Sequence, residues 1–244
     1  MKVAQEKTVG EIAAENPTSV RVFESLGIDY CCGGKRSLAD ACSQTGLGVA
    51  DLLKRLEEAA GNARETVAEG WNEAPLARLI AHIVDHHHAH VRNETPRLET
   101  MLSKVVGRHG EKHPEVRKIR RLFAVLIEEL TTHMLKEEQI LFPYIEKMEQ
   151  ATDTGKPIPP AFFGSVARPV AHMVADHDDA ASLLESIRSE ANNYVPPADA
   201  CGTFRALYAG LEEFERDLKR HVHLENNILF PRATKLEQIH DRAA

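Results

Sequence analysis

The sequence predicts an all-α protein in which a four-helix bundle follows a small helical domain. Along four long segments, apolar residues recur at steps of three and four, which places them on one face of a helix. Short stretches rich in glycine, proline or asparagine separate these segments, so neighbouring helices should be antiparallel, in an up-down-up-down order. Aromatic residues make up only 5 % of the chain, and runs of alternating β-branched residues, typical of strands, are scarce.

Residues 1–60 are expected to form the small helical domain. Thr8 and Glu11 have the spacing of a capping box, which marks the start of a first helix. Pro17 suits the first position of a second helix, because its missing N–H is not needed there. Ser37 is placed to begin a third helix, and a fourth should follow before the domain ends.

A glycine-rich turn between the second and third helices carries two adjacent cysteines, Cys31 and Cys32. We expect both thiols to be accessible, and a position near helix N-termini can lower a thiol pKa and make the group reactive or metal-binding. The alternative is that both are small, buried apolar residues. The distribution of the four cysteines argues against a disulfide framework, and the sequence assigns no role to Cys201, which opens the last long helix.

After a polar linker at 61–74, the bundle is expected to occupy 75–234 and to leave a tail at 235–244. His109 and His113 lie in the predicted loop between the first two helices and should be solvated. The helices are expected at about 75–107, 115–149, 164–192 and 199–233.

One segment of the bundle occurs twice. The pattern HxxxExxILFP begins at His133 and again at His221, so Glu137 and Glu225 are matched positions. Residues four apart share a helix face, and each copy therefore points an imidazole and a carboxylate in one direction. Such a pair is often only a surface contact. Here, however, it lies within the apolar stripe, where a buried carboxylate is costly unless it is paired or binds a metal.

The other two long helices each carry a histidine on the apolar face, His88 and His177. The repeat spacing alone leaves His87 as an alternative to His88, and Glu138 should face solvent because it points about 100° away from its neighbour. Nitrogen and oxygen donors of this kind suit non-haem iron. These donors can serve two metals if each carboxylate bridges the pair of metal ions. The six candidate ligands are His88, His133, Glu137, His177, His221 and Glu225.

The charge and hydropathy of the chain limit its partners. The net charge is −7 and lysine or arginine residues form no stripe, so nucleic acid is not an expected partner. No apolar run approaches the roughly 20 residues needed to span a membrane. The N-terminus lacks the apolar core of a signal peptide. We therefore expect a cytoplasmic protein.

Taken together, these motifs resemble the repair-of-iron-centres (RIC) family of di-iron proteins, over nearly the whole chain. The segment from Asp29 to Lys35, DYCCGGK, resembles the small cysteine-containing domain of that family. The two HxxxExxILFP segments and Asp176-His177-Asp178-Asp179-Ala180 resemble its haemerythrin-like domain. The resemblance implies a haemerythrin-like bundle around an oxo- or hydroxo-bridged pair of iron ions. It also implies His88 rather than His87 as the first of the six ligands.

The resemblance further implies repair of iron-sulfur clusters damaged by nitric oxide or oxidative stress, with the protein acting as an iron donor. Damaged iron-sulfur proteins would be its partners, and Cys31 and Cys32 would pass the iron onward. One alternative is an enzyme that reduces nitric oxide to nitrous oxide at the same two irons. A less favoured alternative is a carrier or sensor of O₂ or nitric oxide, because carriers use more imidazoles and need no thiol module. The sequence leaves open the enzymatic activity and whether the chain forms a homodimer.

Overall fold

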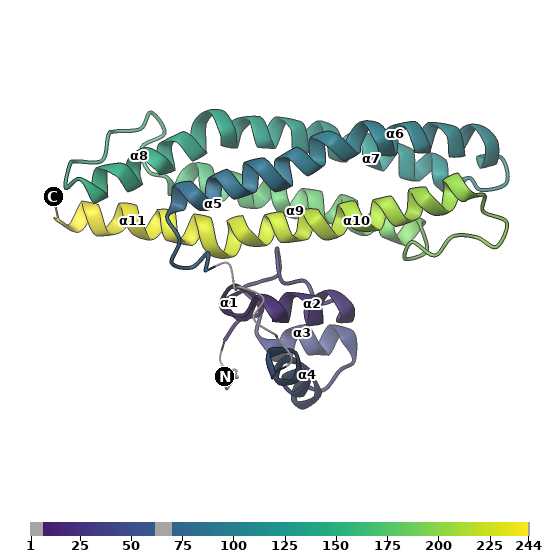
Figure 1. Ribbon diagram of the computed structural model, residues 1–244, viewed down its shortest axis with the longest axis horizontal. Helices are drawn as coiled ribbons and strands as arrows, with labels where there is room; N and C mark the ends of the chain where they lie inside the picture. Colours follow the sequence, from purple (N-terminus) through teal and green to yellow (C-terminus); the bar gives the residue numbers. More distant parts are fainter. Residues whose placement is uncertain (1–6, 62–69, 244) are drawn as a thin grey trace. The chain divides into compact units, whose positions relative to one another are not determined.

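The computed structural model describes residues 7–61 and 70–243, which are mainly helical (Figure 1). Within these ranges, the only sheet-type pairings are two isolated β-bridges. The all-α prediction is therefore confirmed. No helix in the described part of the chain is long and apolar enough to cross a membrane. Most of the predicted linker at 61–74 lies outside the described residues.

The chain divides into two compact units, and the division runs through the long helices. One unit comprises residues 1–80, 146–159 and 219–244, and the other comprises residues 81–145 and 160–218.

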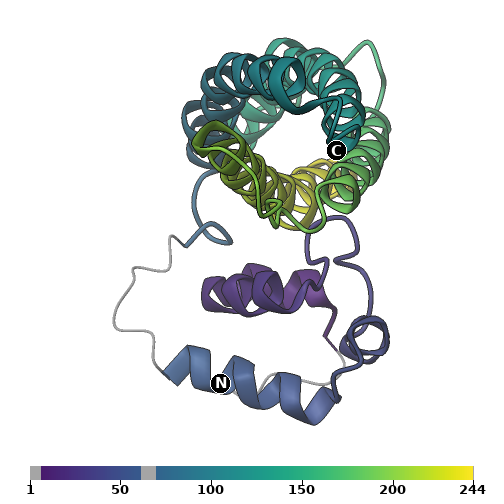
Figure 2. The same ribbon diagram turned by 90° about the vertical axis from the view of Figure 1, so that its right-hand side faces the viewer.

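The unit formed by residues 81–145 and 160–218 is a bundle of four helices. Helix α6 packs against α7, and α7 packs against α9. Helix α10 completes the bundle, since the Phe214 ring lies 5.5 Å from that of Phe123 on α7 and 6.2 Å from that of His90 on α6. Seen end on, the helices surround a common axis (Figure 2). The elements are η1 (Ile83–His88), α6 (Ala89–His109), α7 (Glu115–Lys136), η2 (Glu137–Leu141), α9 (Ala167–Glu190) and α10 (Gly202–Leu224).

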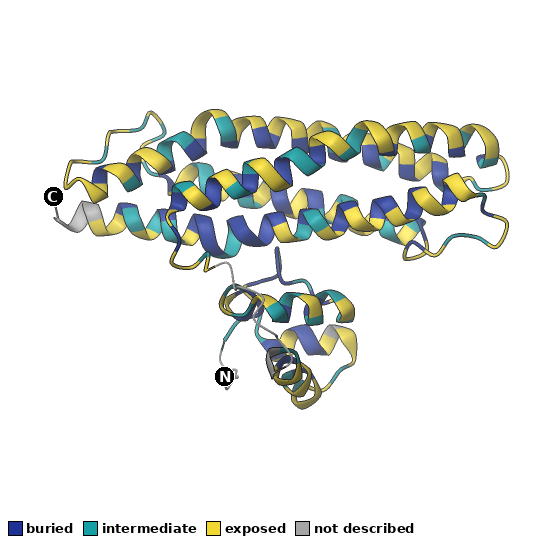
Figure 3. Ribbon diagram, viewed as in Figure 1, coloured by how far each residue is buried: buried dark blue, intermediate teal, exposed yellow. Residues whose placement is uncertain are grey.

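The apolar stripe of α7 forms the bundle core, as its spacing predicts. Figure 3 shows buried residues recurring along the inner faces of the long helices. Burial of one such leucine or phenylalanine side chain stabilises the folded state by about 1.5–3 kcal/mol relative to leaving it exposed. The stripe therefore determines which face of the helix points into the bundle. The buried residues of α7 are Val116, Ile119, Phe123, Leu126, Leu130, His133 and Met134. A histidine within this series has to face the interior too.

In the part of the chain that the structure describes, three π-helical turns widen the long helices, and the apolar periodicity does not predict them. In η2 the backbone N–H of Phe142 donates to the carbonyl of Glu137, and in η3 (Glu225–Leu229) that of Phe230 donates to the carbonyl of Glu225. A proline follows directly in both copies. Proline has no N–H and crowds the carbonyl four residues earlier, so a wider turn lets the helix continue through it. The ILFP part of the repeat thus specifies a π-turn that begins at the glutamate.

The N-terminal helices begin and end where local sequence signals place them. The side chain of Thr8 accepts from the backbone of Glu11 in a complete capping box, and Pro17 is the first residue of α2. Gly27 ends α2 with a left-handed φ of 67°, a conformation that favours glycine. Ser37 caps α3. The elements are α1 (Val9–Glu15), α2 (Pro17–Leu26), α3 (Leu38–Thr45) and α4 (Val49–Gly61).

Parts of the long helices belong to the same unit as this domain. Two backbone N–H groups at the start of α5, those of Leu76 and Ala77, donate to the carboxylate of Glu149 on α8. The last helix extends to Ala243, beyond its predicted end near residue 233. The elements are α5 (Leu76–His82), α8 (Phe142–Asp153) and α11 (Phe230–Ala243).

Candidate metal centre

Four of the predicted ligands meet inside the four-helix unit. His88 ends η1, His133 lies near the end of α7, Glu137 begins η2 and His177 lies on α9; none is more than 3 % exposed. His88 Nε2 lies 3.5 Å from Glu137 Oε2, and His133 Nε2 lies 3.3 Å from Glu137 Oε1. His133 Nε2 and His177 Nε2 are 2.9 Å apart. The three imidazoles therefore converge around one buried carboxylate.

The second copy of the repeat places its pair in the same way. His221 Nε2 lies 3.0 Å from Glu225 Oε1, and the two residues are 1 % and 0 % exposed. Helix α10 carries the histidine and η3 begins at the glutamate, which reproduces the arrangement of His133 and Glu137 on α7 and η2. Each repeat thus supplies one imidazole and one carboxylate from the junction of an α-helix and a π-turn.

The six side chains form two overlapping groups of four. In each group, the ligand atoms all lie within 4.8 Å of one another. Both groups contain Glu137 and Glu225. One group adds His88 and His221, and the other adds His133 and His177. Each group therefore offers two imidazoles and two carboxylates, and the carboxylates are common to both.

The spacing and chemistry of these atoms fit a transition-metal cation. Imidazole nitrogens and carboxylate oxygens bind such metals at about 2.0–2.2 Å, which separates adjacent ligand atoms by about 3 Å. The spacings above, from 2.9 to 3.5 Å, match that separation. Two fully buried carboxylates also carry negative charge into the interior, which is costly without a cation. The six residues therefore form a site that can hold metal.

Two carboxylates outside this group hold the far side of the ligand imidazoles. His88 Nδ1 lies 2.6 Å from Glu138 Oε1, and His133 Nδ1 lies 3.3 Å from Asp176 Oδ2. An imidazole held at Nδ1 leaves Nε2 to face a metal. Burial opposes the ionisation of Glu138, but its hydrogen bonds with His88 and Arg92 outweigh that effect and lower its pKa. The expectation that Glu138 faces solvent is wrong, because its side chain is only 24 % exposed.

Replacing Glu138 with alanine should weaken metal binding although this residue is not a ligand in either group. The His88 ring would lose the acceptor at Nδ1 that orients it, and loss of such a partner typically costs about 10–100-fold in metal affinity. Competition with a chelator measures the change. Glu146→Ala, at an exposed position on α8, is the matched control. Equal affinities in the two variants would show that the contact does not orient His88.

His87, the alternative from the repeat spacing, belongs to a different contact. It is 8 % exposed and its Nδ1 lies 3.0 Å from Asp217 Oδ1. Neither ligand group includes it, whereas His88 is in one of them. The structure thus brings His88 to the cluster, as the family resemblance implies.

The cysteine turn forms a third group of metal-ligating side chains. The sulfur atoms of Cys31 and Cys32 are 3.8 Å apart, and Cys31 Sγ lies 3.3 Å from Asp29 Oδ1. The ligand atoms of these three residues lie within 4.8 Å of one another. Contact with Cys32, burial and the nearby Asp29 charge raise the pKa of Cys31. The expectation of an accessible thiol with a lowered pKa is therefore wrong for Cys31, which is 4 % exposed; Cys32 is half-buried.

Two asparagines tie this turn to η3. Asn227 Nδ2 lies 3.1 Å from the carbonyl oxygen of Tyr30 and 3.4 Å from that of Cys31. Asn226 Nδ2 also lies 3.4 Å from the Cys31 carbonyl oxygen. These asparagines directly follow Glu225, whereas the first repeat has Glu and Gln there. The difference between the repeats thus has a structural reason, because only the second copy binds the cysteine turn.

A groove on the four-helix unit reaches two of the candidate ligands. Its volume is about 480 Å³, and both His133 and His177 line it. Four carboxylates and one lysine also line the groove: Glu128, Glu129, Asp176, Asp179 and Lys136. The negative lining favours cations over anions.

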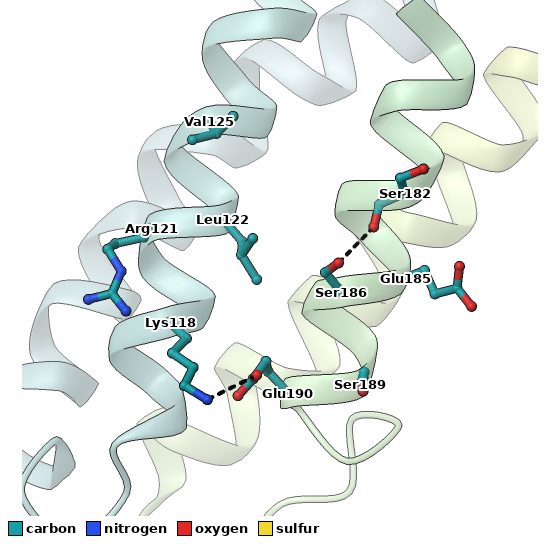
Figure 4. A pocket seen from close by; sticks show the side chains of 9 residues that line it. All are labelled: Lys118, Arg121, Leu122, Val125, Ser182, Glu185, Ser186, Ser189 and Glu190. Carbon is teal, nitrogen blue, oxygen red and sulfur yellow. Dashed lines mark hydrogen bonds and ion pairs between the residues drawn. The ribbon is translucent and has the colours of Figure 1, made fainter.

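A second groove, of about 790 Å³, lies further along α7 and α9 (Figure 4). No histidine or cysteine is among its nine lining residues, and Lys118 pairs there with Glu190 at 3.2 Å. Of these two grooves, only the smaller one is therefore lined by candidate ligands.

Known proteins share both parts of this architecture. A family model described as the hemerythrin HHE cation binding domain matches residues 79–233, which confirms the haemerythrin-like fold. A model described as a domain of unknown function, DUF542, matches residues 5–60. The iron-sulfur cluster repair protein YtfE of Pectobacterium atrosepticum is 38 % identical over 96 % of this chain and 99 % of its own. That of Escherichia coli O81 is 38 % identical over 94 % and 97 %. The chain therefore belongs to the YtfE family of iron-sulfur cluster repair proteins.

Proposed function

We propose that the protein holds two iron ions in its bundle and supplies iron for the repair of iron-sulfur clusters damaged by nitrosative or oxidative stress. The observation that carries this proposal is the pair of overlapping ligand groups that share Glu137 and Glu225. Two adjacent positions with common carboxylates suit a dinuclear centre, and the mixture of imidazole and carboxylate suits non-haem iron. The repair role in this proposal comes from the relatives, which are named iron-sulfur cluster repair proteins.

Each side chain has a distinct part in this proposal. Glu137 and Glu225 would be shared by the two metal positions and would balance their charge, while two histidines would complete each position. Bound iron would supply redox change and exchangeable coordination positions. Glu138 and Asp176 hold the imidazoles of His88 and His133 through Nδ1. The resulting orientation of Nε2 favours metal binding without further rearrangement.

The acidic groove supports movement of iron between the centre and the outside. Its lining includes His133 and His177, so a cation in the groove would lie beside two of the candidate ligands. Asp176 is shared, since it lies 3.1 Å from Lys136 Nζ and 3.3 Å from His133 Nδ1.

The cysteine turn is proposed to receive iron on its way to a damaged protein. Thiolates hold iron in iron-sulfur clusters, and Asp29 adds an oxygen ligand beside Cys31 and Cys32. The raised pKa of Cys31 keeps its thiol protonated at neutral pH, and an arriving cation can displace that proton. Asn227 attaches the turn to the π-turn that begins at Glu225.

A Cys31→Ser, Cys32→Ser variant should keep its iron and helical content but repair more slowly. The change removes two thiol ligands and leaves all six bundle residues in place. The measurement is recovered activity of an iron-sulfur enzyme, first damaged with nitric oxide and then mixed with iron-loaded protein. Metal-free protein is the baseline, and Cys42→Ser controls for loss of a thiol elsewhere in the same domain. Wild-type rates in the double variant would exclude the relay, while a failure of the iron-loaded wild type would exclude the repair function.

The groove also favours the second candidate function, reduction of nitric oxide to nitrous oxide. A groove lined by His133 and His177 would bring small molecules close to the centre. Mixing the anaerobic iron(II) protein with excess nitric oxide and a reductant separates the two functions. Nitrous oxide released over many turnovers would support the reductase. A stoichiometric iron nitrosyl or simple loss of iron would support the donor.

A further inference from the structure

A cysteine and a histidine outside the metal centre form a close pair in the four-helix unit. Cys201 Sγ lies 3.2 Å from His109 Nε2. Cys201 directly precedes α10 and His109 is the last residue of α6, and both are half-buried. The expectation that His109 is a solvated loop residue is therefore wrong. The pair also gives Cys201 a chemical neighbour that the sequence did not reveal.

Neighbouring residues hold this pair in place. The His109 ring lies 5.4 Å from the ring of Phe204, which is 0 % exposed. The backbone N–H of Arg205 donates to the carbonyl of Cys201, which fixes the cysteine to the first turn of α10. Phe204, a buried residue of α10, therefore packs against the imidazole and keeps it beside the sulfur.

The carboxylate nearest in sequence is engaged elsewhere. Asp199 pairs with Lys112 at 2.6 Å and with His113 Nε2 at 3.1 Å. His113 in turn pairs with Glu115 through Nδ1 at 3.0 Å. These pairs keep the negative charge of Asp199 neutralised by cations or hydrogen-bond donors, so it opposes formation of a thiolate less than a free carboxylate would.

Cys201 differs in its surroundings from the other cysteines. Cys31 and Cys42 are 4 % and 3 % exposed, and Cys32 is half-buried against the sulfur of Cys31. Only Cys201 among the four combines partial exposure, an imidazole nitrogen at its sulfur and the start of a long helix. An adjacent imidazole and a helix N-terminus are the general means by which proteins activate cysteine nucleophiles.

We propose that Cys201 is a site of reversible thiol modification by small disulfides, with His109 as its base. The thiol proton passes to His109 Nε2 while the sulfur attacks one sulfur of the disulfide. A mixed disulfide forms, the original S–S bond breaks, and the departing thiolate takes the proton from His109. Cys201 is oxidised and the small disulfide is reduced, so the step needs no other reactant. The step does not depend on the proposed iron chemistry.

Oxidised glutathione is a suitable probe for the full-length, iron-loaded protein at neutral pH. Peptide mass mapping at short times should find the mixed disulfide at Cys201 before Cys32 or Cys42. The rate should exceed that of an unstructured cysteine peptide under the same conditions. Modification at Cys32 first, or a rate at Cys201 no higher than that of the peptide, would overturn the proposal without any variant.

His109→Gln tests the role of the base. The substitution should slow modification of Cys201 by at least about 10-fold at neutral pH, since a positioned base commonly contributes 10²–10⁴-fold. The difference should shrink at high pH, where solvent removes the thiol proton. His113→Gln is the matched control, because that ring also packs on Phe204 but pairs with the carboxylates of Glu115 and Asp199. Equal slowing by both substitutions, or the same deficit at every pH, would indicate a merely structural effect and contradict the proposal.

Discussion

Replacing Glu137 or Glu225 with alanine will reduce the iron content from the proposed two ions per chain to one or none. Each glutamate belongs to both ligand groups, so one substitution removes a ligand from both metal positions. It also removes a negative charge that would balance two cations in a buried site. Loss of a single histidine affects only one of the groups and should be less severe. Metal analysis after anaerobic reconstitution and desalting measures the effect.

Glu146→Ala is the control for this experiment, because Glu146 is exposed on α8 and belongs to neither ligand group. It should retain as much iron as the wild type. Glu137→Gln separates shape from charge, since the amide fills the same space but carries no negative charge. Two firmly bound iron ions in Glu137→Ala would mean that this carboxylate is not shared between the metals. The proposed dinuclear arrangement would then be wrong.

The helices and the residues of the cluster could be predicted because they depend on local signals. The capping box of Thr8 and Glu11 requires only residues within one helical turn. The register of the apolar stripe on α7 fixes the direction of His133 and Glu137. Because the motif occurs a second time, the same argument also predicts the direction of His221. None of these steps requires knowledge of which helices touch.

Contacts between distant segments could not be predicted in this way. Glu138 faces His88 across 50 positions of sequence, so a helical wheel of its own segment places it wrongly in solvent. His109 meets Cys201 across 92 positions. Cys31 is buried in a turn held by Asn227, 196 positions away. In each case the partner is set by the packing of whole helices, which periodicity alone does not determine.

Gly34→Ala will loosen the cysteine turn from η3 and lower the stability of the protein. A Cβ atom at this position would lie 2.6 Å from Asn227 Oδ1 and 2.9 Å from the carbonyl oxygen of Tyr30. Real Cβ atoms essentially never approach so closely, and the second neighbour is backbone, so the turn itself has to move. Overpacking of this kind costs about 1–3 kcal/mol.

The movement would also break hydrogen bonds that hold the turn. Asn227 contacts the carbonyls of Tyr30 and Cys31, and the N–H of Gly10 donates to the carbonyl of Gly34 at 2.8 Å. Once these contacts weaken, Cys31 should become accessible. We therefore expect a lower midpoint of thermal unfolding together with faster alkylation of Cys31.

Gly107→Ala is the matched control, because a Cβ there would meet nothing within 4 Å and the residue lies inside α6. Alanine in a helix interior is favoured over glycine, so this variant should be as stable as the wild type or slightly more so. Asn227→Ala gives a second approach to the same contact, since it removes the hydrogen bonds without adding bulk. Both Gly34→Ala and Asn227→Ala should speed alkylation of Cys31, while the iron content stays that of the wild type because all six ligands remain. Protection of Cys31 that persists in both variants would show that Asn227 does not hold the turn. The burial of Cys31 would then depend on the helices of its own domain rather than on contacts with η3, the π-turn that begins at Glu225.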